Sequence, residues 1–199
     1  MAIINVPAGF SVAAQIWEQQ RMDVEFRSMF GAQAIEGSAP LWATTITASL
    51  KRPELWQALM LQLRGRTNQL ALWNHGRPVP KGTMRGTMTA GATAQGATAM
   101  TVTATGQGSR TLLAGDYLGV GSGLTQQVVM LTADATANAS GVIAVAFEPA
   151  LRNALSAGAA VTWDRPKALF RSTESKASWE YAPGTVRGMS LRLLEDWRP

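Results

Sequence analysis

The sequence predicts a mainly β protein, with a discontinuous β-sandwich-like outer domain that contains one α-helix and an inserted small β-barrel or β-sandwich domain. Short runs in which apolar and polar residues alternate recur along the chain and indicate half-buried strands. One segment shows the three-to-four-residue spacing of a helix. Residues 85–163 differ in composition, because 41 of these 79 residues are Ala, Thr or Gly.

The domain limits follow from that change in composition. The Pro-containing basic segments HGRPVPKGT and WDRPKALF lie at its borders, and exposed proline-rich joints tolerate insertions. We therefore expect residues 1–84 and 164–199 to form the outer domain and residues 85–163 to form the insert. The insert holds three basic and three acidic residues, so the net charge of +5 comes entirely from the outer domain.

Strands are expected in several parts of the outer domain. In RMDVEFRSMF, charged residues alternate with Met22, Val24 and Phe26, which predicts a half-buried strand with these three side chains on one face. LWATTITASL is rich in β-branched residues and has a similar period. Near the C-terminus, SKASWEYA and TVRGMSLRLLEDW flank a Pro-Gly turn signal and predict a hairpin, in which Gly188 marks a bulge.

The segment KRPELWQALMLQLRG is expected to form the helix. Pro53 suits a first helical position, and Gly65 suits the residue that ends a helix. Between them, Trp56, Leu59 and Leu63 recur at helical spacing and are predicted to pack onto the outer sheet. The following NQLALWN is predicted to be a strand.

The insert is expected to consist of short strands separated by glycine-containing turns. One of these turns, GVGSG, has the look of a phosphate-binding loop, but its spacing does not fit. Leu124 stands where the dinucleotide fingerprint requires Gly, and no lysine is near to complete a P-loop. Because a strand rather than a helix follows, we expect a hairpin turn in which glycine supplies positive φ.

Catalytic and metal-binding chemistry has little support in the sequence. The chain has one histidine, His75, and no cysteine, which argues against a zinc site and against a recognisable Ser-His-Asp triad. The close carboxylate pairs Asp23/Glu25 and Glu195/Asp196 fit strand surfaces better than glycoside hydrolysis. No apolar run approaches the roughly 20 residues of a membrane span. We therefore expect no enzyme activity, no cofactor, no metal and no membrane insertion.

Basic and aromatic residues gather after the expected helix. They are Arg64, Arg66, Trp73, Arg77 and Lys81. Such a set is typical of a single-stranded nucleic-acid site or of the rim of a protein interface. We favour an interface between subunits, with the lining of a channel as the alternative.

The order of these features resembles the distal tail proteins of long-tailed bacteriophages with non-contractile tails. A helix leads through Arg-Gly into an aromatic-bearing strand in LWQALMLQLRGRTNQLALWN, and HGRPVPKGTMRGT leads into the Ala/Thr/Gly-rich insert. RPKALFR and WEYAPGTVRGMSLRLLEDW then return the chain to the outer domain. The resemblance extends from about Leu41 to Trp197 and rests on order and composition.

This resemblance implies a structural virion protein without catalytic activity, located at the tip of the phage tail and assembled in the host cytoplasm. Its copies, commonly six, would form a ring that joins the tail tube protein to the hub or baseplate protein around a channel for DNA. Two alternatives stay open: a tail tube subunit, and a carbohydrate-binding module for host-surface attachment. The carbohydrate-binding alternative would need aromatic residues to stack on a sugar, and the insert has few. They are Tyr117, Phe147 and, at its border, Trp163.

Overall fold

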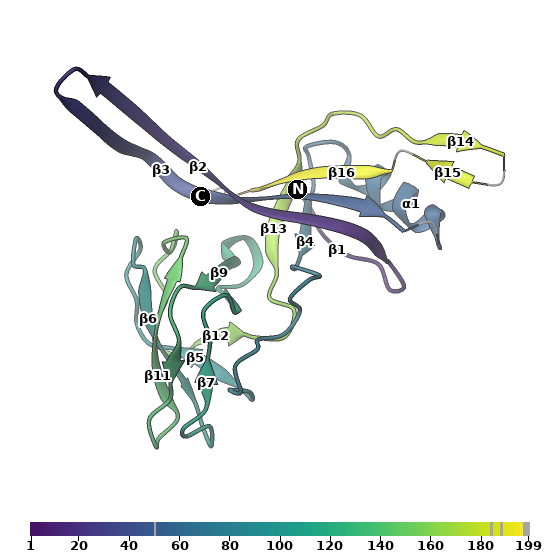
Figure 1. Ribbon diagram of the computed structural model, residues 1–199. Coiled ribbons are helices and arrows are strands. Elements are labelled where there is room, and N and C mark those ends of the chain that lie inside the picture. Colours follow the sequence, from purple (N-terminus) through teal and green to yellow (C-terminus); the bar gives the residue numbers. More distant parts are fainter. Residues whose placement is uncertain (50, 184, 188, 197–199) are drawn as a thin grey trace.

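Six strands of the outer domain form one sheet in the order β1-β4-β13-β16-β3-β2 (Figure 1). The computed structural model describes residues 1–49, 51–183, 185–187 and 189–196. Neighbouring strands are antiparallel except for the parallel pair β1 and β4. The strands are β1 (Ile3–Asn5), β2 (Val12–Ser28), β3 (Gly31–Ala48), β4 (Gln69–Leu72), β13 (Ala168–Ser172) and β16 (Ser190–Glu195). The two separate pieces of the outer domain therefore share one sheet, with the C-terminal strands β13 and β16 in its middle.

Helix α1 (Pro53–Leu63) begins and ends where the sequence predicts. Pro53 lies in the first turn, where its missing N–H costs no hydrogen bond. At the other end Arg64 and Gly65 have φ of 49° and 63°, and the Arg64 N–H donates to the Leu61 carbonyl oxygen (3.2 Å). The side chains that the helix buries are Trp56, Leu59, Met60 and Leu63. Three of these belong to the hydrophobic cluster of the outer sheet, as predicted.

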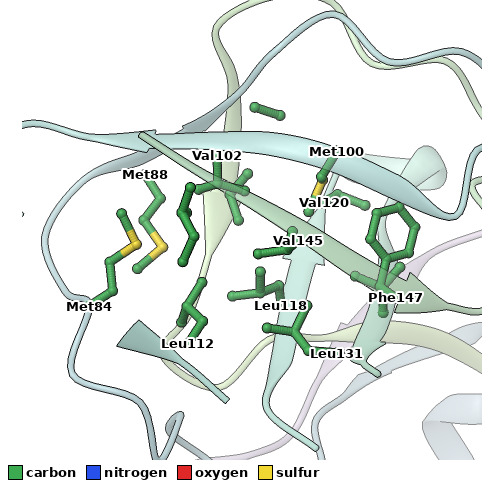
Figure 2. Packing of buried hydrophobic residues seen from close by; sticks show 14 of the residues in the cluster. Met84, Met88, Met100, Val102, Leu112, Leu118, Val120, Leu131, Val145 and Phe147 are labelled. Atoms are coloured by element: carbon green, nitrogen blue, oxygen red, sulfur yellow. The ribbon is translucent and has the colours of Figure 1, made fainter. Parts of the chain in front are cut away.

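The insert contains a closed barrel with strand order β11-β6-β5-β12-β8-β9. In β11, Ile143, Val145 and Phe147 are buried and alternate with exposed alanines. Aliphatic and methionine side chains from the surrounding strands meet these residues in the interior (Figure 2). The barrel strands are β5 (Met88–Ala90), β6 (Ala99–Ala104), β8 (Tyr117–Val120), β9 (Gln127–Leu131), β11 (Val142–Glu148) and β12 (Ala159–Thr162). The expected mainly β fold, with a helix in the outer domain and a small barrel in the insert, is confirmed.

Two further two-stranded sheets complete the described chain. β7 (Thr111–Leu112) pairs with β10 (Ala135–Thr136), and Leu112 is buried in the barrel cluster. β14 (Glu180–Ala182) pairs with β15 (Thr185–Arg187), which confirms the hairpin predicted near the C-terminus. The predicted bulge at Gly188 lies outside the described residues.

The first two residues of GVGSG belong to β8, and its last three begin the connection between the antiparallel strands β8 and β9. The short 3-10 helix η1 (Gly123–Thr125) lies in this connection. Gly121 has a φ of +76°, and a Cβ atom there would lie 2.5 Å from the Thr125 carbonyl oxygen. Glycine is therefore required by both conformation and space. The predicted hairpin turn, in which glycine supplies positive φ, is confirmed.

The barrel and the outer sheet meet through packed side chains. Val128 of the barrel joins the hydrophobic cluster of the sheet, and the Trp42 indole N–H donates to its carbonyl oxygen (2.8 Å). Arg152 forms an ion pair with Glu195, and their side chains are only 6% and 2% exposed. Burial raises the pKa of the Glu195 carboxyl, although the Arg152 guanidinium opposes this shift. The ion pair thus ties residues of the insert and of the C-terminal strand together in a buried position.

Candidate assembly surface

Strands β2 and β3 continue beyond the sheet as a two-stranded hairpin that projects from the body (Figure 1). β16 pairs with β3 over residues 43–47, so the hairpin beyond that point rests on its own cross-strand hydrogen bonds. Every residue from 21 to 39 is exposed. We call this segment, residues 21–39, the arm.

One face of the arm is apolar. Val24 lies directly opposite Ile35, and Met22 and Phe26 extend the same face along β2. At the tip, Met29 and Phe30 are 89% and 92% exposed. Of the thirteen strongly exposed large hydrophobic side chains in the described part of the chain, six lie in the arm. Contiguous exposed apolar surface of this kind marks an interaction site rather than ordinary solvent-facing surface.

The opposite face of the arm is charged. Arg27 pairs with Glu25 (2.9 Å between Nε and Oε1), and both side chains are largely exposed. Asp23 lies directly opposite Glu36, an arrangement of like charges that destabilises an isolated hairpin. These two carboxylates, Glu148 and the basic side chain of Arg21 line a hollow of about 300 Å³ beside the barrel. This face therefore carries charges of both signs, with three carboxylates and two basic side chains.

The backbone of the arm adds a third binding feature. β2 is the last strand of the sheet order, so its outer edge presents backbone N–H and C=O groups that can pair with another strand. Natural proteins usually shorten or cover such edges. A strand of 17 residues with an uncovered edge and an apolar face is therefore a favourable site for assembly.

The sequence predicted the strand of the arm correctly but its burial wrongly. Met22, Val24 and Phe26 do share one face, yet all three are exposed rather than half-buried. The reason is the absence of a second layer over this part of the hairpin in the described chain. The arm was not predicted as a site, although its two long consecutive strands exceed the common strand length of about 3–10 residues and could have indicated it.

The five residues predicted at an interface fall into two groups. Arg64 and Arg66 lie just beyond α1, where Arg64 is exposed and the Arg66 guanidinium donates to the Thr173 carbonyl oxygen (2.6 Å). The other three lie on the segment that leads from β4 into the barrel.

In this second group, the Trp73 ring stacks on His75 with ring centroids 4.8 Å apart. The Arg77 guanidinium donates to the Gly115 carbonyl oxygen (2.9 Å), and the Lys81 backbone N–H donates to a carboxylate oxygen of Asp116 (2.7 Å). These contacts hold the connecting segment against the barrel. The predicted role of all five residues at subunit contacts or in a channel stays a prediction.

The candidate catalytic groups have structural partners. Glu195 accepts a hydrogen bond from the Trp42 backbone N–H (2.8 Å) in addition to its ion pair, and Asp196 accepts one from the Gln69 side-chain amide (2.9 Å). Burial lowers the pKa of His75, which favours its neutral form. Among the described residues, no three His, Cys, Asp or Glu side chains gather in a way that could hold a metal ion.

The chain matches no known family model and no curated protein sequence at a significant level. Within the described residues, no helix has the length and apolar character needed to cross a membrane. The arm is therefore assigned from its geometry and chemistry alone.

Proposed function

We propose that this protein is a structural subunit that associates with copies of itself through the arm, forming a ring at the distal end of a phage tail. The observation that carries the proposal is the projecting hairpin with an exposed apolar face. A second copy of the chain is a suitable occupant, because it offers hydrophobic and basic surface in one molecule. The ring would connect the tail tube protein to the hub or baseplate protein around a channel for DNA, with six copies as the expected number.

The tail tube alternative uses the same feature. A projecting hairpin with an unpaired edge serves a stacked tube as well as a single ring, so the arm does not separate the two. The difference lies in the product: a ring of fixed height, or a tube that grows with protein concentration. Electron microscopy of the purified protein distinguishes them.

The carbohydrate-binding alternative has less support. Sugar recognition by aromatic stacking needs exposed rings, and Tyr117 and Phe147 of the insert are both buried. Trp163 is partly buried and packs against the barrel cluster, and its indole N–H donates to the Gly86 carbonyl oxygen (2.8 Å). The insert is therefore better suited to a packing role than to a sugar-binding platform.

The proposal is tested by placing a charge on the apolar face of the arm. Wild-type protein is expected to sediment as a closed oligomer and to appear as rings in negative-stain images. Val24→Asp is expected to shift the protein to monomer, because a carboxylate would have to be desolvated in the contact.

Leu124→Asp is the matched control, since Leu124 is an equally exposed apolar residue on the barrel turn. This variant is expected to assemble as the wild type does. A wild-type protein that stays monomeric at high concentration, with and without its tube and hub partners, would contradict the proposal.

A further inference from the structure

We infer that the arm of one copy docks onto the α1 end of the next copy, so that the contact joins two different surfaces head to tail. The α1 end is defined here by Leu61, Arg64, Arg66, Lys176 and Tyr181. The inference rests on the proposed self-association and goes beyond it by naming the surface that receives the arm.

The position of the two surfaces excludes a contact between them within one chain. The arm projects from one end of the molecule, and α1 lies at the other end of the sheet (Figure 1). The arm strands run roughly 25 Å from the body at about 3.3 Å per residue and point away from α1. The arm of a chain therefore cannot reach its own α1 end. A contact between different surfaces of identical chains repeats from copy to copy and closes into a ring when the rotation permits.

The charges of the two surfaces are complementary. The arm, residues 21–39, carries three acidic and two basic residues, a net charge of −1. Residues 61–66 carry two basic residues, and residues 173–181 add one basic and two acidic residues, so the α1 end has a net charge of +1. Opposite charges steer two surfaces into register, and like charges oppose contact between two arms.

Both surfaces also offer exposed apolar groups. On α1, Leu61 is exposed one turn before Arg64. Tyr181 is exposed beside the helix, where its hydroxyl oxygen accepts a hydrogen bond from the Gln57 side-chain amide (3.1 Å). Leu61 and Tyr181 are thus two exposed apolar side chains on and beside α1. The arm tip offers the exposed apolar side chains of Met29 and Phe30.

Cross-linking tests the contact directly, because the wild-type chain has no cysteine. A chain with Phe30→Cys and Leu61→Cys, treated with a short bis-maleimide, is expected to give a ladder of covalent oligomers that ends at the ring. The matched control carries Phe30→Cys and Leu124→Cys and is expected to give no ladder, although both of its sites are exposed.

The single-cysteine chains separate the alternatives. Phe30→Cys alone is expected to stay uncross-linked, and efficient dimers from it would overturn the inference in favour of arm-to-arm contact. A ring that forms in sedimentation but gives no ladder with the Phe30/Leu61 pair would overturn this inference and leave the proposed function standing. A protein that does not associate at all would overturn both.

Charge reversal supplies an independent test. Asp23→Lys with Glu36→Lys reverses charge on the arm, and Arg64→Glu with Lys176→Glu reverses charge on the α1 end. Each variant alone is expected to associate on the order of tenfold more weakly at low salt. An equimolar mixture is expected to recover association in a ring of alternating chains, because each arm then meets an α1 end of opposite charge. Failure of the mixture to associate better than either variant alone would contradict the head-to-tail contact.

Discussion

The arm and the barrel are built from strands with a similar alternation of apolar and other residues, but the apolar face is buried in the barrel and exposed in the arm. In barrel strand β11, Val145 and Phe147 face an interior that is closed on all sides by paired strands. In the arm, Val24 and Phe26 have the same alternation and face outward. The difference shows that a two-residue period specifies a strand and its two faces, but not what covers either face.

The carboxylates of the two regions also differ in the groups that they face. In the barrel, the Asp116 carboxylate accepts hydrogen bonds from the backbone N–H groups of Lys81, Gly82 and Leu113 (2.7–3.0 Å). In the arm, Asp23 and Glu36 face each other across the two strands. In the barrel, the Asp116 carboxylate is thus satisfied by backbone groups of the same chain. In the arm, Asp23 and Glu36 are suited to contact with another molecule.

The largest effect on stability is expected from the barrel interior. Phe147→Ala should reduce the free energy of unfolding by about 3–5 kcal/mol, because it removes a fully buried ring and leaves a cavity. Phe26→Ala in the arm is the matched control and should change the unfolding of the dilute monomer very little. Urea denaturation measures both. Equal losses in the two variants would mean that the arm is already covered in the monomer.

A buried and an exposed ion pair allow a second comparison between the body of the molecule and the arm. Arg152→Met should cost about 3–5 kcal/mol, because it leaves the Glu195 carboxylate buried without its cation. Arg27→Met breaks an exposed pair of the arm and should leave the unfolding free energy of the monomer unchanged within error. Thermal or urea unfolding at low protein concentration compares them. A negligible effect of Arg152→Met would show that water replaces the guanidinium.

The helix offers a third comparison between buried and exposed leucines. Leu59→Ala should reduce the free energy of unfolding by about 2–5 kcal/mol, since Leu59 is fully buried against the sheet. Leu61→Ala, on the exposed side of α1, should preserve stability and weaken assembly if the α1 end receives the arm. A loss for Leu59→Ala within the error of measurement would contradict the packing of the helix.

The smallest effect on the isolated chain is expected from the arm itself. Val24→Asp should change the unfolding free energy of the monomer by no more than about 0.5 kcal/mol, as for other surface substitutions. The same change is expected to abolish assembly, so stability and association are measured on one sample by unfolding and by sedimentation. A variant that loses both would place Val24 in the folded core of the monomer.

Local features of the fold could be predicted from the sequence. Pro53 and Gly65 mark the ends of α1 because missing N–H groups and positive φ act within a few residues. Gly121 marks the β8–β9 turn for the same reason. The strand that carries Val24 and Phe26 was predicted from an equally local alternation.

Of the candidate surface, the sequence determined the two faces of the arm and its acidic excess. Only the tertiary structure decided that no layer of the described residues covers the arm, and that Val128 of the barrel packs in the hydrophobic cluster of the outer sheet. The pairing of Arg152 with Glu195, 43 residues apart, was equally beyond local reasoning. Turns and the period of apolar residues depend on neighbouring residues, so short stretches of sequence are enough to predict them. Burial depends on which distant segments reach a face, and that is settled only when the whole chain packs.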